Sequence, residues 1–134
     1  MIEAPTLQAL VLADQVYVDR DTNKFIISGT FRQLLTAEIP GLLNRETYAY
    51  VCMTNVYGTI NVHLRYIDLE TNQVLLHSTE LPVYASSPVE TVELKIPIAP
   101  LPMPHEGVYA FEVHVGDEML GAFRVSVRRV SEEG

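Results

Sequence analysis

The segment Pro102–Val115 constrains the fold of this chain more than any other stretch. A proline-rich loop ends at Gly107, and a strand then begins in which every second residue shares a face. Tyr109 stands on that face two residues before Phe111, with a glycine just upstream. In antiparallel β-sandwiches, a tyrosine at this place near the start of a strand ties the strand to the preceding corner. The spacing therefore predicts that Tyr109 is buried and structural, with its hydroxyl bonded to backbone near that corner.

Alternation of apolar and polar residues with a period of two recurs along the chain, and no segment shows the helical period. Turn residues separate these segments at short intervals, as in Glu70-Thr71-Asn72. The pattern predicts an all-β fold, an antiparallel two-sheet sandwich of about eight strands. A length of 134 residues fits a single domain covering residues 1–134. The expected strands are Leu7–Val18, Lys24–Phe31, Tyr48–Thr54, Thr59–Leu69, Gln73–Thr79, Val89–Ile98, Gly107–Val115 and Ala122–Val130.

Three features inside this pattern carry local expectations. Gly29 lies within a strand and indicates a bulge or a close backbone contact. The segment Thr36–Asn44 contains Pro40-Gly41 and is expected to be a loop, as is the stretch between Pro82 and Pro88.

The last hairpin has a register problem that the sequence itself exposes. A plain two-residue turn at Gly116-Asp117 would pair Tyr109 with Arg124 and mix the apolar and polar faces. A three-residue loop, or alternatively a bulge at Gly121, would instead pair Tyr109 with Val125 and place Phe111 opposite Phe123. Both alternatives predict the same pairing of the apolar faces.

Charge and cysteine content exclude several classes of function. The 17 acidic and 9 basic residues give a net charge of -8, which repels phosphate backbones and anionic membranes. We therefore expect neither a nucleic-acid partner nor a membrane partner. Cys52 is the only cysteine, so no intrachain disulfide can form. Together with an N-terminus that lacks the features of a signal peptide, this favours a reducing, cytoplasmic compartment.

Two groups of residues deserve comparison with metal sites. Asp19, Asp21 and Asn23 form D-x-D-x-N, the opening of a calcium loop, but Lys24 and Thr30 stand where an EF-hand needs glycine and glutamate. We interpret the segment as a hairpin turn. The histidines show no zinc-ligand spacing and are interpreted as surface residues; they are His63, His77, His105 and His114.

No catalytic constellation is visible in the sequence. Cys52 lies between Val51 and Met53 on a strand and is expected to be a buried, inert thiol. No nucleophile elbow, phosphate-binding loop or dinucleotide fingerprint is present. We therefore predict no catalytic residues, no cofactor-binding residues, no metal ligands and no cofactor, and expect the protein not to be an enzyme.

Three segments together resemble an uncharacterised family of small bacterial β-sandwich proteins, a domain of unknown function. These segments are Leu10–Val16 with Asn23–Phe31, then Val62–Asp68, and finally Glu106–Val113. The resemblance implies an immunoglobulin-like sandwich in a bacterial cytoplasm, and it implies no active site. The cysteine pair and core tryptophan of true immunoglobulin domains are missing.

An interaction or scaffold module is the function that we expect from these features, because sandwiches offer sheet edges and end loops to partners. The alternative is a module that binds a small ligand or carbohydrate through its tyrosines and end loops. The partner is an unknown protein or a second copy of the chain. A homodimer is one way to cover the outer face of Leu7–Val18, with Leu7, Val11 and Tyr17; the chain's own Thr36–Asn44 loop is the other.

Overall fold

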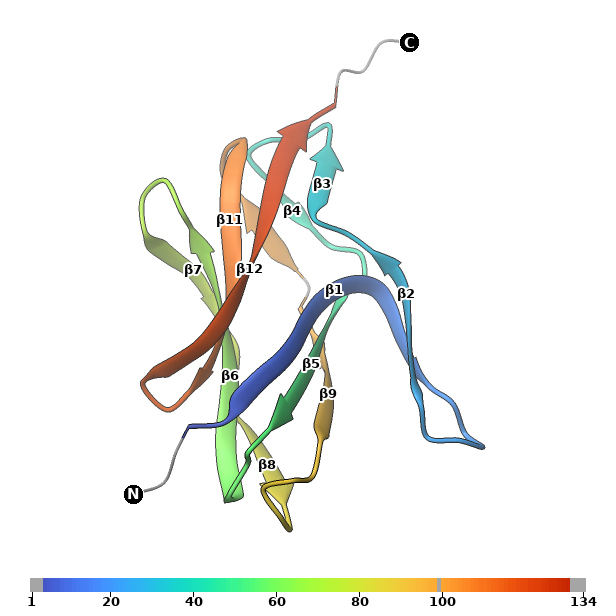
Figure 1. Cartoon of the computed structure of the whole chain (residues 1–134). Helices are drawn as coiled ribbons and strands as arrows, with labels where there is room; N and C mark the ends of the chain where they lie inside the picture. Colours follow the sequence, from blue (N-terminus) through green and yellow to red (C-terminus); the bar gives the residue numbers. More distant parts are fainter. Residues whose placement is uncertain (1–3, 99, 131–134) are drawn as a thin grey trace.

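The computed structural model of the chain describes residues 4–98 and 100–130. These residues form strands, turns and loops and contain no helix, so the all-β prediction is confirmed. Consequently, no helix in this part of the chain is long and apolar enough to cross a membrane. Figure 1 shows two sheets that face each other, with the β1–β2 hairpin extending away from the body of the domain.

The first sheet has four strands in the order β2-β1-β5-β9, and all of its neighbouring pairs are antiparallel. Its strands are β1 (Thr6–Val18), β2 (Phe25–Thr30), β5 (Tyr48–Thr54) and β9 (Val92–Pro97).

The second sheet has six strands in the order β3-β12-β11-β6-β7, and β8 pairs with the first half of β6. Its strands are β3 (Gln33–Thr36), β6 (Gly58–Asp68), β7 (Gln73–His77), β8 (Leu81–Ala85), β11 (Gly107–Val115) and β12 (Glu118–Arg129). Only the pair β3–β12 is parallel. A two-stranded sheet joins β4 (Gly41–Leu43) to β10 (Leu101–Met103).

The strand count and the sheet count depart from the prediction. The eight expected strands correspond to β1, β2, β5, β6, β7, β9, β11 and β12, and the structure adds β3, β4, β8 and β10. Two of the added strands, β4 and β10, contain three residues each and form a third sheet, so the expected loop Thr36–Asn44 is partly a strand. The strand β8 contains Pro82 and occupies a sheet edge, where proline is tolerated because one side of the strand needs no partner.

The main core fills the space between the four-stranded and six-stranded sheets. Leu12 and Val51 enter it from the first sheet, and Tyr66, Tyr109 and Val125 enter it from the second. These side chains are fully or almost fully buried. Because both sheets contribute alternate residues to one core, the sandwich architecture follows from the period-two pattern.

A smaller apolar cluster covers the outer face of the four-stranded sheet. Val16 and Tyr50 are buried there, and Phe25 packs against Tyr50 with ring centroids 5.6 Å apart. Val11 belongs to this cluster, so the chain's own strand β2 supplies cover for this part of β1. Leu7 packs instead against the main core.

The loop that was one of the two alternatives for covering this face packs elsewhere. Ile39 and Leu43 lie against the main core, so the segment Thr36–Asn44 does not cover the outer face of β1. Tyr17 remains 51% exposed.

The last hairpin has the predicted register, and a bulge produces it. Tyr109 pairs with Val125 and Phe111 with Phe123. The register shifts between Val113 and His114, whose partners are Gly121 and Met119, so Leu120 is the extra residue. The structure therefore shows the bulge next to Gly121, and not the three-residue loop.

The expected close contact at Gly29 is also present. Gly29 has a φ of 72°, and a β-carbon placed on it would lie 2.6 Å from a carboxylate oxygen of Asp14. Glycine adopts this positive φ at no steric cost, whereas a side chain at this position would also crowd Asp14.

Candidate functional site

The corner predicted from the sequence is present at the start of β11. The Tyr109 ring is buried, and its hydroxyl donates a hydrogen bond of 2.6 Å to the carbonyl oxygen of His105. The same hydroxyl accepts a hydrogen bond of 3.2 Å from the backbone N–H of His105. Tyr109 therefore fixes the conformation of the proline-rich loop, which confirms its structural role.

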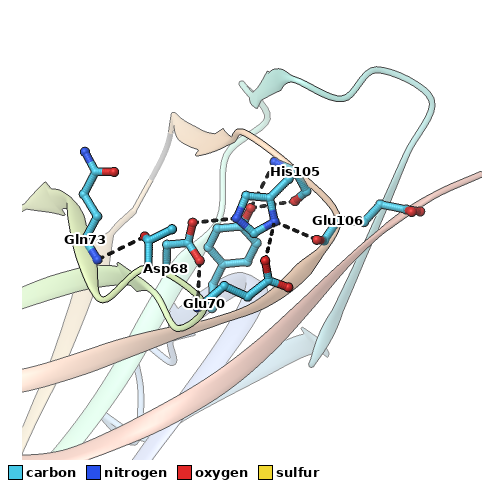
Figure 2. Close-up of polar contacts among 7 residues, drawn as sticks. Asp68, Glu70, Gln73, His105 and Glu106 are labelled. Atoms are coloured by element: carbon cyan, nitrogen blue, oxygen red, sulfur yellow. Dashed lines mark hydrogen bonds and ion pairs between the residues drawn. The ribbon is translucent and has the colours of Figure 1, made fainter.

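An ion pair that the sequence analysis missed lies beside this corner. Figure 2 shows the His105 ring between Asp68, the last residue of β6, on one side and the Glu106 backbone and Glu70 side chain on the other. His105 Nε2 lies 2.6 Å from Oδ2 of Asp68, which is only 2% exposed. His105 Nδ1 lies 2.7 Å from the carbonyl oxygen of Glu106 and 3.6 Å from Oε2 of Glu70. The other carboxylate oxygen of Asp68 accepts the N–H of Glu70 at 3.0 Å.

The contacts of the His105 ring favour its protonated form. Both ring nitrogens of His105 face oxygen acceptors, so the arrangement favours the imidazolium, which donates from both nitrogens. The hydrogen bond to the Glu106 carbonyl and the one to Asp68 hold the pKa of His105 above its usual range. Burial raises the pKa of Asp68, but the hydrogen bonds from His105 and from the Glu70 N–H outweigh it, and the net pKa lies below its ordinary value.

A histidine–carboxylate pair is also part of many hydrolytic sites, where the histidine acts as a general base. A general base must have a free nitrogen within reach of the proton that it removes. Here both nitrogens of His105 are engaged, and the Tyr109 hydroxyl is bonded to backbone. The geometry is that of a charged clamp between β6 and the loop before β11.

The expectation that all four histidines are surface residues is wrong for two of them. His63 and His114 are 4% and 6% exposed, although both lie on the outward face of the six-stranded sheet. They are directly opposite each other on β6 and β11, and their rings stack with centroids 5.1 Å apart. His77 of β7 packs edge-on against His63 at 4.5 Å and is itself exposed, as expected. The rings cover each other, which the alternation of residues cannot reveal.

These rings are not arranged as a metal site. No group of three or more histidine, cysteine or carboxylate side chains among residues 4–98 and 100–130 has a geometry that could hold a metal ion. His114 Nε2 contacts Oε1 of Glu112 at 2.8 Å. Burial, followed by the nearby His77 and His114, lowers the pKa of His63. Both ring nitrogens of His63 lack a hydrogen-bond partner in the described part of the chain.

Cations and apolar side chains gather on the outer face of the six-stranded sheet. From this point, "the outer face" means only this surface of the six-stranded sheet, which carries the outward residues of β3, β12, β11 and β6. Arg124 and Arg128 are exposed on β12, and Leu35 of β3 lies beside Arg128 and is 60% exposed. Val108 of β11 and Met119 of β12 add exposed apolar area along the same strands.

The carboxylates of this surface are few. Among the described residues of these four strands, the outward register positions hold one carboxylate, Glu112, which already contacts His114. Arg65 lies directly opposite Glu112 on β6. The outer face is thus cationic and partly apolar in a chain whose net charge is -8.

A cavity of about 230 Å³ opens between the two sheets on the opposite side of these strands. It lies where β7 approaches the segment that joins β9 to β10. Its lining is mostly apolar and consists of Leu64, Tyr66, Leu76, His77, Ser78, Pro97, Ile98, Pro100, Leu101 and Phe111. The exposed tyrosines Tyr17, Tyr57 and Tyr84 do not line it.

The D-x-D-x-N segment forms a hairpin turn, as interpreted from the sequence. Asp19 lies in the turn between β1 and β2, and its carboxylate accepts the N–H and the hydroxyl of Thr22. The hydroxyl of Thr22 holds the pKa of Asp19 below its ordinary value. Asn23 closes the turn with a φ of 59°.

Cys52 is half-buried in the smaller cluster, so it is less buried than expected.

Comparison with known proteins agrees with the family suspected from the sequence. Residues 8–128 match the model of a family that is described as a family of unknown function (DUF6941). No curated protein matches the chain.

Two solved structures are similar over nearly the whole chain. An immunoglobulin-like protein from Pseudomonas aeruginosa is 13% identical, with a TM-score of 0.43 over 95% of this chain and 98% of that one. The CARDB domain of a Pyrococcus furiosus protein, solved in complex with di-metal ions, is 14% identical, with a TM-score of 0.42 over 95% and 96%.

Proposed function

We propose, from the premise that the chain belongs to the DUF6941 family, that the protein is a non-enzymatic interaction module that binds an acidic, partly apolar segment of a partner protein. The observation that carries the proposal is the outer face of the six-stranded sheet. It combines three arginines with exposed apolar side chains and holds a single, already engaged carboxylate among the described residues of its strands.

The composition of this surface is that of a binding face. Arginine and methionine are enriched at protein interfaces, whereas lysine and glutamate are depleted. Arg124 and Arg128 lie four residues apart on β12. Because side chains alternate between the two faces of a strand, both project from the same side of the sheet. Leu35, Val108 and Met119 lie along the same strands and supply apolar contact area between and beside them.

Charge complementarity defines the partner. The chain as a whole has a charge of -8, so it repels acidic proteins at a distance, except where a local patch reverses the sign. An acidic segment docked on the outer face would pair with Arg124 and Arg128 and would favour one orientation. A basic segment would face these arginines unpaired, which opposes binding.

A catalytic role has less support in the same geometry. The His105–Asp68 pair has both imidazole nitrogens bonded to oxygen atoms, and the second histidine–carboxylate contact, His114–Glu112, joins two residues of one strand face without a nucleophile assigned beside it. A ring whose two nitrogens are held by oxygen atoms, with a raised pKa, stabilises the corner and has no free nitrogen for a substrate proton. We therefore assign the His105–Asp68 pair to the architecture of the domain, consistent with a binding module.

The test combines capture with measurement on purified components. Partners are captured from cells of the source organism, identified by mass spectrometry and purified, and the affinity is measured by calorimetry at low and high salt. The double variant Arg124→Glu, Arg128→Glu should weaken binding by about tenfold or more, equivalent to about 1.4 kcal/mol. The matched control Arg20→Glu, Lys24→Glu reverses two exposed cations in the β1–β2 hairpin and changes the net charge equally. It should leave the affinity within about twofold.

Three results would refute this function. The first is an equal loss of affinity in the test and control variants. The second is a captured partner whose contact segment is basic. The third is a sedimentation mass of twice 15.0 kDa that the arginine variant returns to the monomer, because a second copy of the chain would then occupy the outer face.

A further inference from the structure

The cavity between β7 and the β9–β10 segment has a floor made of aromatic rings. Phe111 and Tyr66 form this floor, with ring centroids 4.9 Å apart. Tyr66 stacks in turn on Tyr109 at 5.4 Å, and Tyr109 stacks on His105 at 5.4 Å. The rings therefore form a continuous row that begins at the cavity and ends at the corner clamp. Tyr66 and Phe111 are only 1% and 2% exposed, so they close the bottom of the hollow by their edges while their faces pack against each other and against the core.

The walls of the cavity are mostly apolar. Pro97 and Pro100 form one side, where the pyrrolidine ring fixes the backbone angle φ. Leu64, Leu76 and Leu101 complete the enclosure. The hollow of about 230 Å³ is open to solvent on the side of Leu76 and His77, and it differs from other hollows of the surface in its mostly apolar lining beside the main core.

The polar groups of the lining restrict the charge of an occupant. The hydroxyl of Ser78 is already engaged, since it accepts the N–H of Leu64 at 2.8 Å and donates to the carbonyl of Thr79 at 3.1 Å. Two polar groups of the lining then remain for a ligand, the exposed His77 and the Tyr66 hydroxyl, which is buried without a hydrogen-bond partner in the described part of the chain. A charged molecule would lose its hydration without a charged partner among the lining residues, which disfavours binding strongly.

The volume restricts the size of an occupant. An apolar protein cavity of about 150 Å³ holds one benzene molecule, and drug-sized ligands occupy pockets of about 300–1,000 Å³. The hollow in this domain falls between these values. A molecule of one or two fused rings would fill it, whereas an amino-acid polymer or a sugar chain would not fit inside.

We propose that this cavity binds one small, uncharged, mainly apolar molecule of one or two fused rings, which packs against Leu64, Leu76 and Leu101 and offers its polar atom to the Tyr66 hydroxyl or to His77. The site is independent of the outer face, because Leu64, Tyr66 and Phe111 point between the sheets whereas the arginines point outward. A failure of the partner-binding proposal therefore leaves this inference intact, and the reverse also holds.

Indole is a suitable probe, because it is uncharged and consists of two fused rings with one N–H donor. Methyl resonances of the protein are followed by NMR during titration with indole, and indole-3-carboxylate provides the matched charged compound. We expect saturable shifts of the Leu64, Leu76 and Leu101 methyl groups and intermolecular NOEs to at least two of them. We expect the carboxylate to cause shifts at least about tenfold weaker at equal concentration.

Two tryptophan substitutions test the location. Leu76→Trp fills the cavity from an exposed edge-strand position and should abolish the indole-dependent shifts. Leu35→Trp adds the same side chain at an exposed position of β3 and should leave them unchanged. The inference is overturned if indole produces no saturable shifts up to its solubility limit, or if the Leu76→Trp protein binds it as well as the wild type. It is also overturned if the NOEs fall on residues outside the cavity; this outcome needs no variant.

Discussion

Removal of the Tyr109 hydroxyl is the most direct test of the corner. In Tyr109→Phe the ring stays in the core, but the carbonyl and the N–H of His105 both lose their partner. A hydrogen bond contributes about 1 kcal/mol net, and an unsatisfied buried group costs about 1–3 kcal/mol. The carbonyl bond is the shorter of the two, at 2.6 Å against 3.2 Å, so most of the loss comes from it. We expect the free energy of unfolding to fall by about 2 kcal/mol.

Urea denaturation measures this loss directly. With an m-value of about 2 kcal/mol per molar urea, the midpoint should move down by about 1 M while the m-value itself stays constant. Tyr109→Ala also removes the buried ring, and it should cost about 3–5 kcal/mol.

The matched control for this experiment is Tyr17→Phe. Its hydroxyl belongs to a half-exposed side chain on β1, and the substitution should change stability by less than about 0.5 kcal/mol. If Tyr109→Phe and Tyr17→Phe give the same midpoint, the hydroxyl does not hold the corner, and the structural assignment of Tyr109 is wrong.

Three further predictions follow from other parts of the molecule. Gly29→Ala should destabilise the fold by about 1–3 kcal/mol in urea, because a β-carbon there meets the Asp14 carboxylate at a positive φ; an unchanged midpoint would contradict this. The two perturbed histidines should give opposite pH dependences of unfolding between pH 5 and 8. His105 has a raised pKa, so its stabilisation is present below 6.5 and is lost as the pH rises through the folded-state value, and His105→Gln should cost most at acid pH. His63 has a lowered pKa, so stability falls as the pH drops below 6.5, and His63→Phe should remove that fall; parallel curves for wild type and variants would refute both assignments. Calorimetric titration of the Asp19–Asn23 turn with micromolar calcium should be silent, and a saturable heat that Asp21→Ala abolishes would show a site.

Much of the fold could be predicted because the long strands carry their own signal. Where a strand has a buried and an exposed face, as in Val92–Pro97, the period of two is visible in the sequence. The register of the last hairpin was also predictable, since a shift by one residue would place Arg124 in the core. The short strands β4 and β10 could not be found, because three residues next to prolines show no period and pair only through the tertiary fold.

The polar cluster illustrates a signal that was present but not used. On the strand that contains Val62, Leu64 and Tyr66, the inward positions continue to Asp68, where a carboxylate stands at a core position. A buried carboxylate needs a partner, and that requirement could have predicted a cation or donors at this end of the strand. Its identity as His105 could not be predicted, because the two residues are 37 positions apart and meet only when β6 pairs with β11.

The burial of His63 and His114 shows the limit of alternation as a guide. Alternation assigns each residue to a face of a sheet, but exposure depends on what lies beside it on that face. The two rings occupy directly opposite positions on neighbouring strands, so each covers the other, and His77 covers His63 from the next strand. An outward residue of a wide sheet is therefore exposed only if its cross-strand neighbours are small or turn away.

The strand pair β6–β11 lines the cavity from one side and carries part of the outer face, namely Arg65 and Val108, on the other. The inward residues Tyr66 and Phe111 line the cavity. Arg65, between Leu64 and Tyr66 in the sequence, points to the opposite face of the sheet. A slip of one residue between the two strands would turn every one of these side chains to the other face. The Asp68–His105 pair joins the last residue of β6 to the loop that leads into β11, so it opposes such a slip. The Asp68–His105 pair thus helps to fix the register that decides which residues of β6 and β11 face inward and which face outward.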